Sequence, residues 1–251
     1  MTQARFEGRS VLVTGGGSGI GFAAAAAFAS EGARVTISDL DEERGRKAVA
    51  EIEALGGIAQ FIPGDATRER DVERLVACAV DAFGPIRHAF NNVGLSRDGT
   101  IETMSREDWD WTIATTLTST WLAMKHEIPV MLANGGGTIL NTASMSGKIF
   151  TPAASPAYSA AKAGVIHLSR YASATYAAKG IRVNSVSPGL TATPLIVSMF
   201  SEAERNAIAA ECQAIARAVD PREIAAAVLF LSSDDAAMIT GTDTEVGGGR
   251  R

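Results

Sequence analysis

Six short runs of apolar residues recur along the chain, and each is followed by a polar or glycine-rich segment. Most of these runs are apolar almost throughout rather than alternating, which is typical of strands that helices cover on both faces of a parallel sheet. The predicted strands are Ser10–Thr14, Arg34–Ser38, Ala59–Pro63, His88–Asn91, Thr138–Thr142 and Arg182–Val186.

Segments with the apolar spacing of a helix lie between these runs. Gly32, Gly84 and Gly180 each follow such a segment shortly before a predicted strand, as glycine does after the last turn of a helix. The predicted helices are Gly19–Ser30, Glu42–Leu55, Glu69–Phe83, Arg106–Ala133, Tyr158–Lys179 and Pro221–Ser232. Strands that alternate with helices imply right-handed crossovers, so we expect an α/β fold with a doubly wound parallel sheet, the Rossmann fold.

A glycine-rich turn, residues 14–21, joins the first predicted strand to the first predicted helix. Glycines here let the backbone approach a pyrophosphate, and the helix directs its N-terminal amides at the same anion. The strict Gly-x-Gly-x-x-Gly spacing is absent, because Ile20 stands at its last position. A flexible hairpin is the alternative, but the place between strand and helix favours dinucleotide binding. The candidate contacts in this turn are Gly15, Ser18, Gly19, Ile20 and Gly21.

Asp39 follows the second predicted strand, 18 residues beyond Gly21. A carboxylate in this place accepts hydrogen bonds from the adenosine ribose hydroxyls and repels a 2′-phosphate. No Arg or Lys stands within Thr36–Glu43 to neutralise such a phosphate. Asp39 or Asp41 could instead cap the next helix, and Asp41 suits that role better. The pattern therefore favours NAD over NADP.

Ser144 lies just past the fifth predicted strand, where open α/β sheets bind their ligands. Tyr158 and Lys162 follow with a spacing of four residues, which places both side chains on one face of a helix. A nearby cation stabilises a phenolate and so lowers the pKa of a tyrosine, which suits acid–base catalysis. Each feature alone is a weak signal, but together with the glycine-rich turn they indicate a redox site.

The composition excludes several other classes of protein. The 23 Lys and Arg against 28 Asp and Glu give a net charge of −5 and no basic footprint for nucleic acid. The two cysteines do not indicate a disulfide framework, which fits a reducing cytoplasm, and no apolar run is long enough to span a membrane. The three histidines share no spacing with a nucleophile, so a Ser-His-Asp hydrolase is not indicated, and no metal-ligand spacing is present.

These motifs resemble the short-chain dehydrogenase/reductase family, and the resemblance covers essentially the full length. The residues that carry it are the 14–21 turn, Asn91-Asn92-Val93-Gly94, Ser144, Tyr158 with Lys162, and Ser187-Pro188-Gly189. The resemblance implies about seven strands, hydride transfer between a nicotinamide and a carbinol or carbonyl carbon, and a homotetramer or homodimer. It further implies cofactor contacts at Asp65, Ala66, Asn91, Val93, Gly94, Tyr158, Lys162, Pro188, Gly189, Thr191 and Thr193.

Three positions depart from the family pattern. Thr116 stands where the family has an asparagine that supports a proton relay to the lysine, so Thr116 is a candidate catalytic residue with a weaker relay. Val93 replaces an alanine and adds bulk beside the cofactor. Gly247 replaces an aspartate, a change we expect to affect C-terminal packing more than chemistry.

We expect a single domain over residues 1–251, in which the segment 190–218 is a substrate-loop insertion. Within that segment, residues 195–210 are the expected mobile lid. The segments predicted to line the substrate pocket are Met145, Ser146, Phe150–Ser155, Leu190 and Leu195–Phe200. They are largely apolar or small, with no Arg or Lys apart from Lys148, so a neutral secondary alcohol or ketone is favoured over an anionic substrate.

Two alternatives to an NAD(H)-dependent oxidoreductase of a secondary alcohol or ketone stay open. One is a 3-oxoacyl thioester reductase, which Asp39 disfavours because that reaction usually uses NADPH. The other is a dinucleotide-binding protein with weakened catalysis, which only Thr116 encourages.

Overall fold

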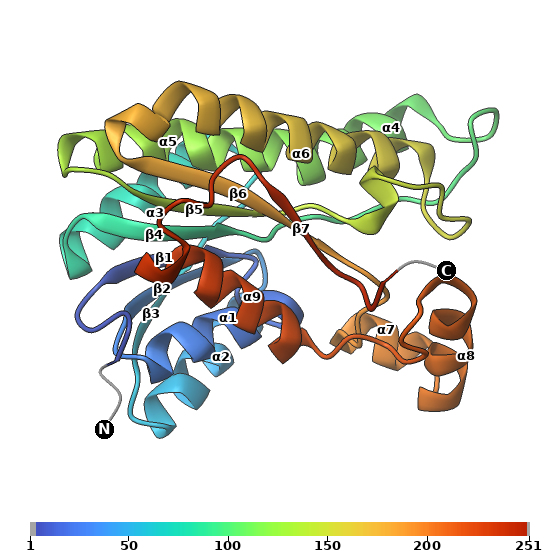
Figure 1. The fold of residues 1–251 in the computed structure, drawn as a ribbon, viewed down its shortest axis with the longest axis horizontal. Coiled ribbons are helices and arrows are strands. Elements are labelled where there is room, and N and C mark those ends of the chain that lie inside the picture. The colour runs from blue at the N-terminus through green and yellow to red at the C-terminus, as the bar shows by residue number, and fades with distance from the viewer. Residues whose placement is uncertain (1–3, 250–251) are drawn as a thin grey trace.

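The computed structural model describes residues 4–249, which form a seven-stranded sheet with helices on both faces (Figure 1). All neighbouring strands are parallel, in the order β3-β2-β1-β4-β5-β6-β7. The strands are β1 (Ser10–Thr14), β2 (Arg34–Asp39), β3 (Ile58–Pro63), β4 (Ile86–Asn91), β5 (Gly137–Thr142), β6 (Ile181–Pro188) and β7 (Asp243–Val246). The strand order reverses between β1 and β4, which makes this the switch point of a Rossmann fold, where such sheets bind ligands.

Two layers of helices cover the sheet. One face is covered by α3 (Glu69–Phe83), α5 (Ser119–Ala133) and α6 (Pro156–Tyr176), and the other by α1 (Gly19–Ser30), α2 (Glu42–Ala54) and α9 (Pro221–Ser232) (Figure 1). Three further helices, α4 (Arg106–Ile113), α7 (Pro194–Met199) and α8 (Glu202–Cys212), lie toward the carboxyl ends of the strands. The single-domain Rossmann fold expected from the sequence is confirmed.

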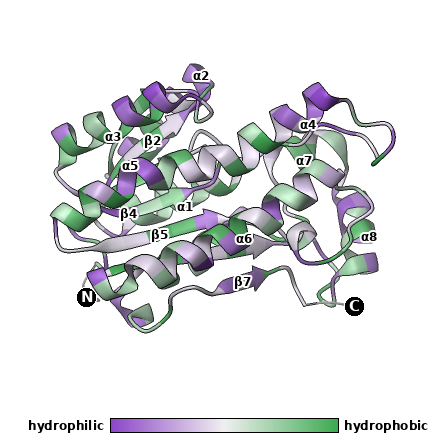
Figure 2. Cartoon of the chain, turned by 90° about the horizontal axis from the view of Figure 1, so that it is seen from above, coloured by the Kyte–Doolittle hydropathy of each residue, from purple (hydrophilic) through white to green (hydrophobic). Residues whose placement is uncertain are grey.

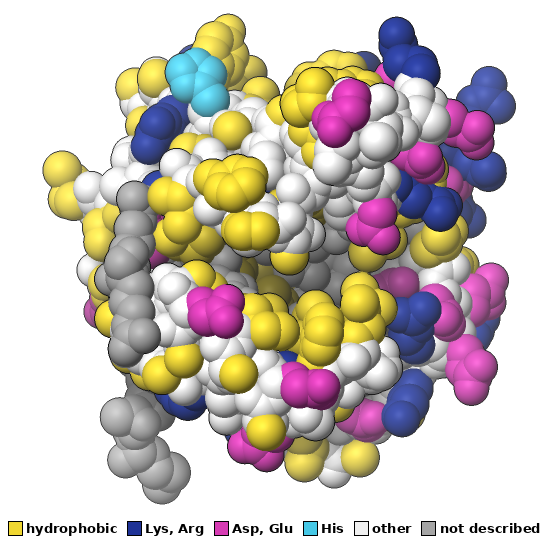
Figure 3. Space-filling model, turned by 90° about the vertical axis from the view of Figure 1, so that its right-hand side faces the viewer, with side chains coloured by type: hydrophobic (Ala, Val, Ile, Leu, Met, Phe, Trp, Pro, Cys, Tyr) yellow, Lys and Arg dark blue, Asp and Glu magenta, His cyan; other side chains and the backbone are white. Residues whose placement is uncertain are grey.

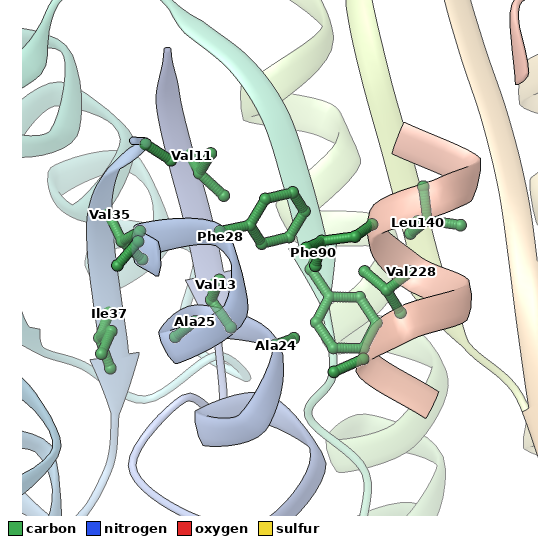
Figure 4. Packing of buried hydrophobic residues seen from close by; sticks show 14 of the residues in the cluster. Val11, Val13, Ala24, Ala25, Phe28, Val35, Ile37, Phe90, Leu140 and Val228 are labelled. Carbon is green, nitrogen blue, oxygen red and sulfur yellow. The ribbon is translucent and has the colours of Figure 1, made fainter. Parts of the chain in front are cut away.

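The larger hydrophobic core lies between the sheet and the α1–α9 layer (Figure 4). Every residue of β1 is buried, and Val11 and Val13 pack there with Phe28 of α1 and Val228 of α9. Strands covered on both faces bury nearly all their side chains, which explains why these runs are apolar throughout. Hydrophilic residues instead gather on outer helices such as α2 and α8 (Figure 2).

The six predicted strands are present, with ends that shift by up to two residues, and β7 is the seventh that the family resemblance implied. The predicted helix Arg106–Ala133 differs from the structure. It is interrupted by one π-helical turn at Ala114–Thr118, so α4 and α5 are separate elements. A turn of this kind widens the helix locally and is frequent at functional sites.

Several features of other protein classes are missing from residues 4–249. No helix among them is long and apolar enough to cross a membrane. No group of three or more His, Cys, Asp and Glu side chains in this range could hold a metal ion. Cys78 and Cys212 are free thiols, as expected.

Candidate active site

A cavity of about 1130 Å³ opens at the carboxyl ends of the strands, on the face that Figure 3 shows hollowed and bordered by hydrophobic side chains. It brings together 16 of the 19 predicted site residues, which come from seven separate segments of the chain. These are Gly15, Ser18, Gly19, Ile20, Asp39, Asp65, Ala66, Val93, Gly94, Ser144, Tyr158, Lys162, Pro188, Gly189, Thr191 and Thr193. Gly21, Asn91 and Thr116 lie outside the cavity lining.

The nucleotide turn, residues 14–21, has the conformation that its glycines suggest. Gly15 and Gly19 have φ of +63° and +55°, a region that other residues rarely adopt. Gly21 does not line the cavity but closes the turn from behind, where an added Cβ would lie 2.1 Å from the Gly15 carbonyl oxygen. The Ser18 side chain makes no capping hydrogen bond, so the first amides of α1 are left for another acceptor. These features fit the diphosphate of a dinucleotide.

Asp39 lines the adenosine end of the cavity at the end of β2. Its Oδ2 accepts a hydrogen bond from the Gly17 amide at 3.0 Å, and its Oδ1 accepts one from the Asp41 amide at 3.1 Å. The carboxylate is thereby fixed in place and still has lone pairs for ribose hydroxyls. Asp41 caps α2 through the Arg44 amide, as the sequence predicts for it.

Arg44 also lines the cavity, although the sequence did not indicate this. It lies one position beyond Thr36–Glu43, the stretch whose lack of Arg and Lys favoured NAD. Its Nε is paired with Asp41 Oδ2 at 2.7 Å, which turns part of the guanidinium charge away from a nucleotide. That pairing is consistent with a preference for NAD. Because Arg44 lines the cavity beside Asp39, its guanidinium could bind a 2′-phosphate if the Asp39 carboxylate were removed.

Asn92, rather than its neighbour Asn91, reaches the cavity. Asn92 Nδ2 donates to the Gly15 carbonyl at 3.2 Å, and its Oδ1 accepts from Thr142 Oγ1 at 3.0 Å. The side chain of Asn91 points into the protein on the other side of β4, where it is 2% exposed and binds Glu127 and Asn141. Successive strand residues face opposite sides, so only one of the two can touch a ligand. The structure thus differs from the predicted direct contact of Asn91.

Ser144, Tyr158 and Lys162 converge at the centre of the cavity. Ser144 Oγ accepts from the Ser146 amide at 3.1 Å, and Ser144 lies close enough to Tyr158 to lower the pKa of its hydroxyl. Lys162 is 2% exposed, and its Nζ donates to the Thr142 carbonyl at 2.5 Å. Ser155 caps α6 by accepting a hydrogen bond from the Tyr158 amide, and Pro156 is the first residue of the helix. The local sequence therefore places Tyr158 in the first turn of α6.

The electrostatics of the pair differ from the sequence expectation. Burial raises the pKa of Tyr158, and the hydrogen bond with Ser144 only partly opposes this rise. Lys162 Nζ lies 5.6 Å from the centroid of the tyrosine ring, and burial lowers the pKa of this lysine to about 7. The lysine therefore loses much of its charge near neutral pH, which weakens the expected lowering of the Tyr158 pKa.

Thr116 lies in the π-helical turn behind Gly94 and is fully buried. Its hydroxyl donates to the Leu95 carbonyl at 2.8 Å. A Cβ on Gly94 would lie 2.8 Å from Lys162 Nζ and 3.6 Å from the Thr116 methyl carbon, so this glycine separates the two side chains. The π turn keeps position 116 beside the lysine, but the threonine hydroxyl is bound to backbone rather than directed at Lys162.

Residues of α7 and α8 line another part of the cavity, and we call these two helices the lid. Thr193 caps α7 and lies against the nucleotide turn, 3.3 Å from the position of a Cβ on Gly19. Gln213, buried at the end of α8, accepts from the Leu190 amide at 2.8 Å and donates to the Arg217 carbonyl at 2.9 Å. No local sequence pattern marks Gln213, because its role depends on a contact with Leu190, which is 23 residues away in the chain.

The C-terminal glycines, where Gly247 was expected to affect packing more than chemistry, also reach the cavity. Gly247 and Gly249 line the cavity. The carbonyls of Gly248 and Gly249 accept from the amides of Ile215 and Ala214, at 2.8 and 3.3 Å. The chain after β7 is thereby tied to the segment that follows the lid.

Lys148, the one cation in the predicted pocket segments, does not line the cavity. Its Nζ is paired with Asp243 at 3.0 Å and with Glu245 at 2.5 Å, both on β7. Around the catalytic side chains the lining is mostly apolar or uncharged, with Asp98 and Lys162 as its charged members in the part of the chain described.

Comparison with known proteins now identifies the family. A family model described as enoyl-(acyl carrier protein) reductase matches residues 15–251. The chain is 42% identical to cyclohexanol dehydrogenase of an Acinetobacter species, over 97% of this chain and 95% of that protein. The chain belongs to the short-chain dehydrogenase/reductase family. It is an oxidoreductase that acts on CH–OH groups.

Other members of this short-chain family support the assignment. A 2,5-dichloro-2,5-cyclohexadiene-1,4-diol dehydrogenase of Sphingobium indicum is 38% identical, over 98% of this chain and 97% of that protein. The crystal structure of levodione reductase superimposes with a TM-score of 0.90 at 32% identity, covering 97% of this chain and 98% of that one. The family recognised from the sequence motifs is thus confirmed.

Proposed function

We propose that the protein is an NAD(H)-dependent dehydrogenase that interconverts a neutral secondary alcohol and its ketone. One observation carries this proposal: Ser144, Tyr158 and the buried Lys162 line the same cavity as the nucleotide turn and Asp39. The proposed acid–base group and the proposed dinucleotide site therefore share one cavity.

The proposed roles follow from the contacts. Bound NAD(H) supplies the hydride acceptor or donor at its nicotinamide ring. Ser144 and Tyr158 hold the substrate oxygen, and Tyr158 Oη gives up its proton to that oxygen in reduction or takes one in oxidation. Lys162, fixed by the Thr142 carbonyl, would bind the nicotinamide ribose, and a bound anion beside it would restore its charge.

Oxidation needs the ionised Tyr158, because the phenolate receives the proton of the alcohol. Burial raises the pKa of this tyrosine, so alcohol oxidation should accelerate as pH rises. Ketone reduction needs the protonated phenol and should be favoured at lower pH.

The substrate class is argued from the lining of the cavity. Met145, Ile149, Phe150, Leu190 and Leu195 offer apolar surface near Ser144 and Tyr158, and Lys148 is turned away to β7. An anionic substrate would find no free cation there other than Lys162 among the described lining residues. Relatives named for cyclohexanol and for levodione suggest a cyclic alcohol or ketone as the first compounds to assay.

Quaternary structure and location complete the proposal. Trp109, Trp121 and Tyr171, on the α4–α6 side, are 37%, 45% and 66% exposed, which is consistent with a homodimer or homotetramer that covers them. Free cysteines are consistent with the cytoplasm. The segment 190–218, which contains α7 and α8, is proposed as the substrate-loop insertion of a single domain.

Replacement of the tyrosine tests the proposal. Tyr158→Phe should lower turnover by roughly 100-fold or more, because it removes the acid–base hydroxyl. NADH affinity, followed by fluorescence titration, should change little. Tyr171→Phe is the matched control on the same helix, since Tyr171 is exposed and lies outside the cavity lining.

A substrate panel separates the competing functions. Oxidation of cyclic alcohols with NAD supports the proposal, whereas a preference for NADPH and 3-oxoacyl thioesters would support the thioester reductase instead. NADH binding without turnover on any alcohol or ketone of the panel would favour the binding protein. Retained turnover in Tyr158→Phe would reject the assigned mechanism.

A further inference from the structure

A buried acid lies beneath the site and takes no part in the mechanism above. Glu127 of α5 is 0% exposed, and its Oε2 accepts a hydrogen bond from Asn91 Nδ2 at 3.1 Å. The same Asn91 nitrogen donates to Asn141 Oδ1 at 3.1 Å, and Asn141 donates to Ser169 Oγ at 2.9 Å. These four side chains form a sealed polar network between β4, β5, α5 and α6.

The network lacks one donor if Glu127 is ionised. Glu127 Oε1 and Asn91 Oδ1 are both buried without a hydrogen-bond partner, and both are acceptors. A carboxylate has only acceptors, whereas a carboxylic acid carries one O–H that can donate. Leaving a buried polar atom unpaired costs about 1–3 kcal/mol. Protonation of Glu127 would supply the hydrogen-bond donor that the network lacks.

Within residues 4–249, no cation forms an ion pair with Glu127 that would compensate a negative charge on it. Glu69 of α3 pairs at the surface with Lys125 and His126. Lys162 of α6 is bound to the Thr142 carbonyl, and Arg182 of β6 binds carbonyls of α9 and of the segments that follow it.

The other titratable groups on the neighbouring strand are also engaged elsewhere. His88 of β4 bonds Thr138, and Arg87 binds the Asn134 and Gly136 carbonyls. Burial raises the pKa of Glu127 to about 7, and the Asn91 hydrogen bond only opposes this rise.

The network meets the site through two neighbouring residues. Asn91 directly precedes Asn92, which holds the Gly15 carbonyl of the nucleotide turn. Asn141 directly precedes Thr142, whose hydroxyl binds Asn92 and whose carbonyl binds Lys162. A change in how Asn91 and Asn141 are held would therefore move both the nucleotide turn and the catalytic lysine.

We propose that Glu127 is a positioning residue that acts as a neutral carboxylic acid and fixes the ends of β4 and β5 beneath the nucleotide turn and Lys162. The effect on cofactor affinity rests on the proposed function, but the protonation state does not. Ionisation of Glu127 at alkaline pH would leave a buried charge without a compensating cation and loosen both strand ends.

Thermal unfolding tests the protonation state without any assay of activity. A group whose pKa is higher in the folded than in the unfolded protein stabilises fully below the unfolded value, and this contribution is lost as pH rises through the folded value. Between pH 5.5 and 8.5 the wild type should lose roughly 5 °C more in Tm than Glu127→Gln, which stays neutral and supplies one donor and one acceptor. Lys162 titrates in the same range but is common to both proteins, so their difference isolates Glu127.

Glu69→Gln is the control, because Glu69 is an exposed acid paired with Lys125 and its own pKa is lowered. Glu69→Gln should lose as much Tm between pH 5.5 and 8.5 as the wild type does. An infrared band of a protonated carboxyl group, present in wild type at pH 6 and absent from Glu127→Gln, gives a direct second reading. The proposal would be overturned if Tm fell equally with pH in wild type and Glu127→Gln, or if that infrared band were absent from the wild type.

Cofactor affinity tests the positioning role. Fluorescence titration should show that NADH affinity of the wild type weakens several-fold more between pH 6 and 8.5 than that of Glu127→Gln. Glu127→Leu, which removes the network partner of Asn91, should bind NADH weakly at every pH. If Glu127→Leu does not fold, the pH comparison with Glu127→Gln still decides. Equal pH dependence of NADH binding in wild type and Glu127→Gln, despite different Tm curves, would reject the positioning role.

Discussion

The two ends of the cavity are built in different ways. At the cofactor end, backbone groups and short polar side chains form a hydrogen-bonded frame, in which Gly17 holds Asp39 and Asn92 holds Gly15. At the substrate end, the short helices of the lid present apolar side chains to solvent: Leu195 is 58% exposed and Phe150, on the facing loop, 88%. Preformed polar groups of this kind can orient a polar ligand, and short helices that line an active-site cavity are a common place for closure over a substrate.

This contrast also concerns energy. Polar contacts of the frame are satisfied within the protein before a nucleotide arrives, so little ordering is needed on binding. The lid gains further stabilisation when its exposed apolar side chains are covered. Substitutions at the cofactor end should therefore change which cofactor binds, and substitutions at the substrate end should change only substrate affinity.

Among substitutions that compare the two ends of the cavity, the largest expected effect is at Asp39. Asp39→Ser removes the charged acceptor for the ribose hydroxyls and should weaken NADH binding by about 2 kcal/mol, or about thirtyfold. It also removes the charge that repels a 2′-phosphate, while Arg44 remains in the cavity lining beside it. NADPH affinity should therefore rise in a fluorescence titration. Adding Arg44→Ala should abolish the gain, and unchanged selectivity in Asp39→Ser would contradict the NAD assignment.

A smaller effect is expected at the lid. Leu195→Ala and Phe150→Ala each remove apolar surface that would cover a bound alcohol, so KM should rise by about fivefold, or about 1 kcal/mol. NADH affinity and Tm should stay close to those of the wild type, because both side chains are exposed in the free protein. Met238→Ala, at an exposed methionine outside the cavity lining, is the control. A loss of NADH affinity in the lid variants would remove the distinction between the two ends.

The smallest effect is expected at Thr116, on the boundary between the two ends. Its hydroxyl is bound to the Leu95 carbonyl and does not reach Lys162. Thr116→Asn provides a longer polar side chain in the π-helical turn and should raise turnover up to about fivefold, or about 1 kcal/mol, or broaden the pH range of activity. Thr116→Val, which keeps the shape but not the hydroxyl, should match the wild type. Unchanged turnover and pH range in Thr116→Asn would argue against a weakened relay.

Much of the fold and of the cofactor end could be predicted from local sequence. The glycine turn, Asp39 and the Tyr158–Lys162 spacing each act within one strand–helix junction or one helix face, where the residues that matter are neighbours in the chain. The π-helical turn at Ala114–Thr118 could not be predicted, since no Pro or Gly lies within it. Asn91 and Asn92 are alike as residues, and which of them faces the cavity depends on the pleat of β4.

The sequence by itself determined the alternation of buried strands and helices, the position of the glycine-rich turn and the three side chains of the proposed catalytic centre. Only the tertiary structure decided that Arg44 stands beside Asp39, that Gln213 and the C-terminal glycines hold the lid, and that Glu127 is sealed beneath the site. The physical reason is the range of the interactions involved. Backbone conformation and helix periodicity act over a few residues, whereas desolvation and hydrogen-bond partners are set by segments that meet only when the chain has folded.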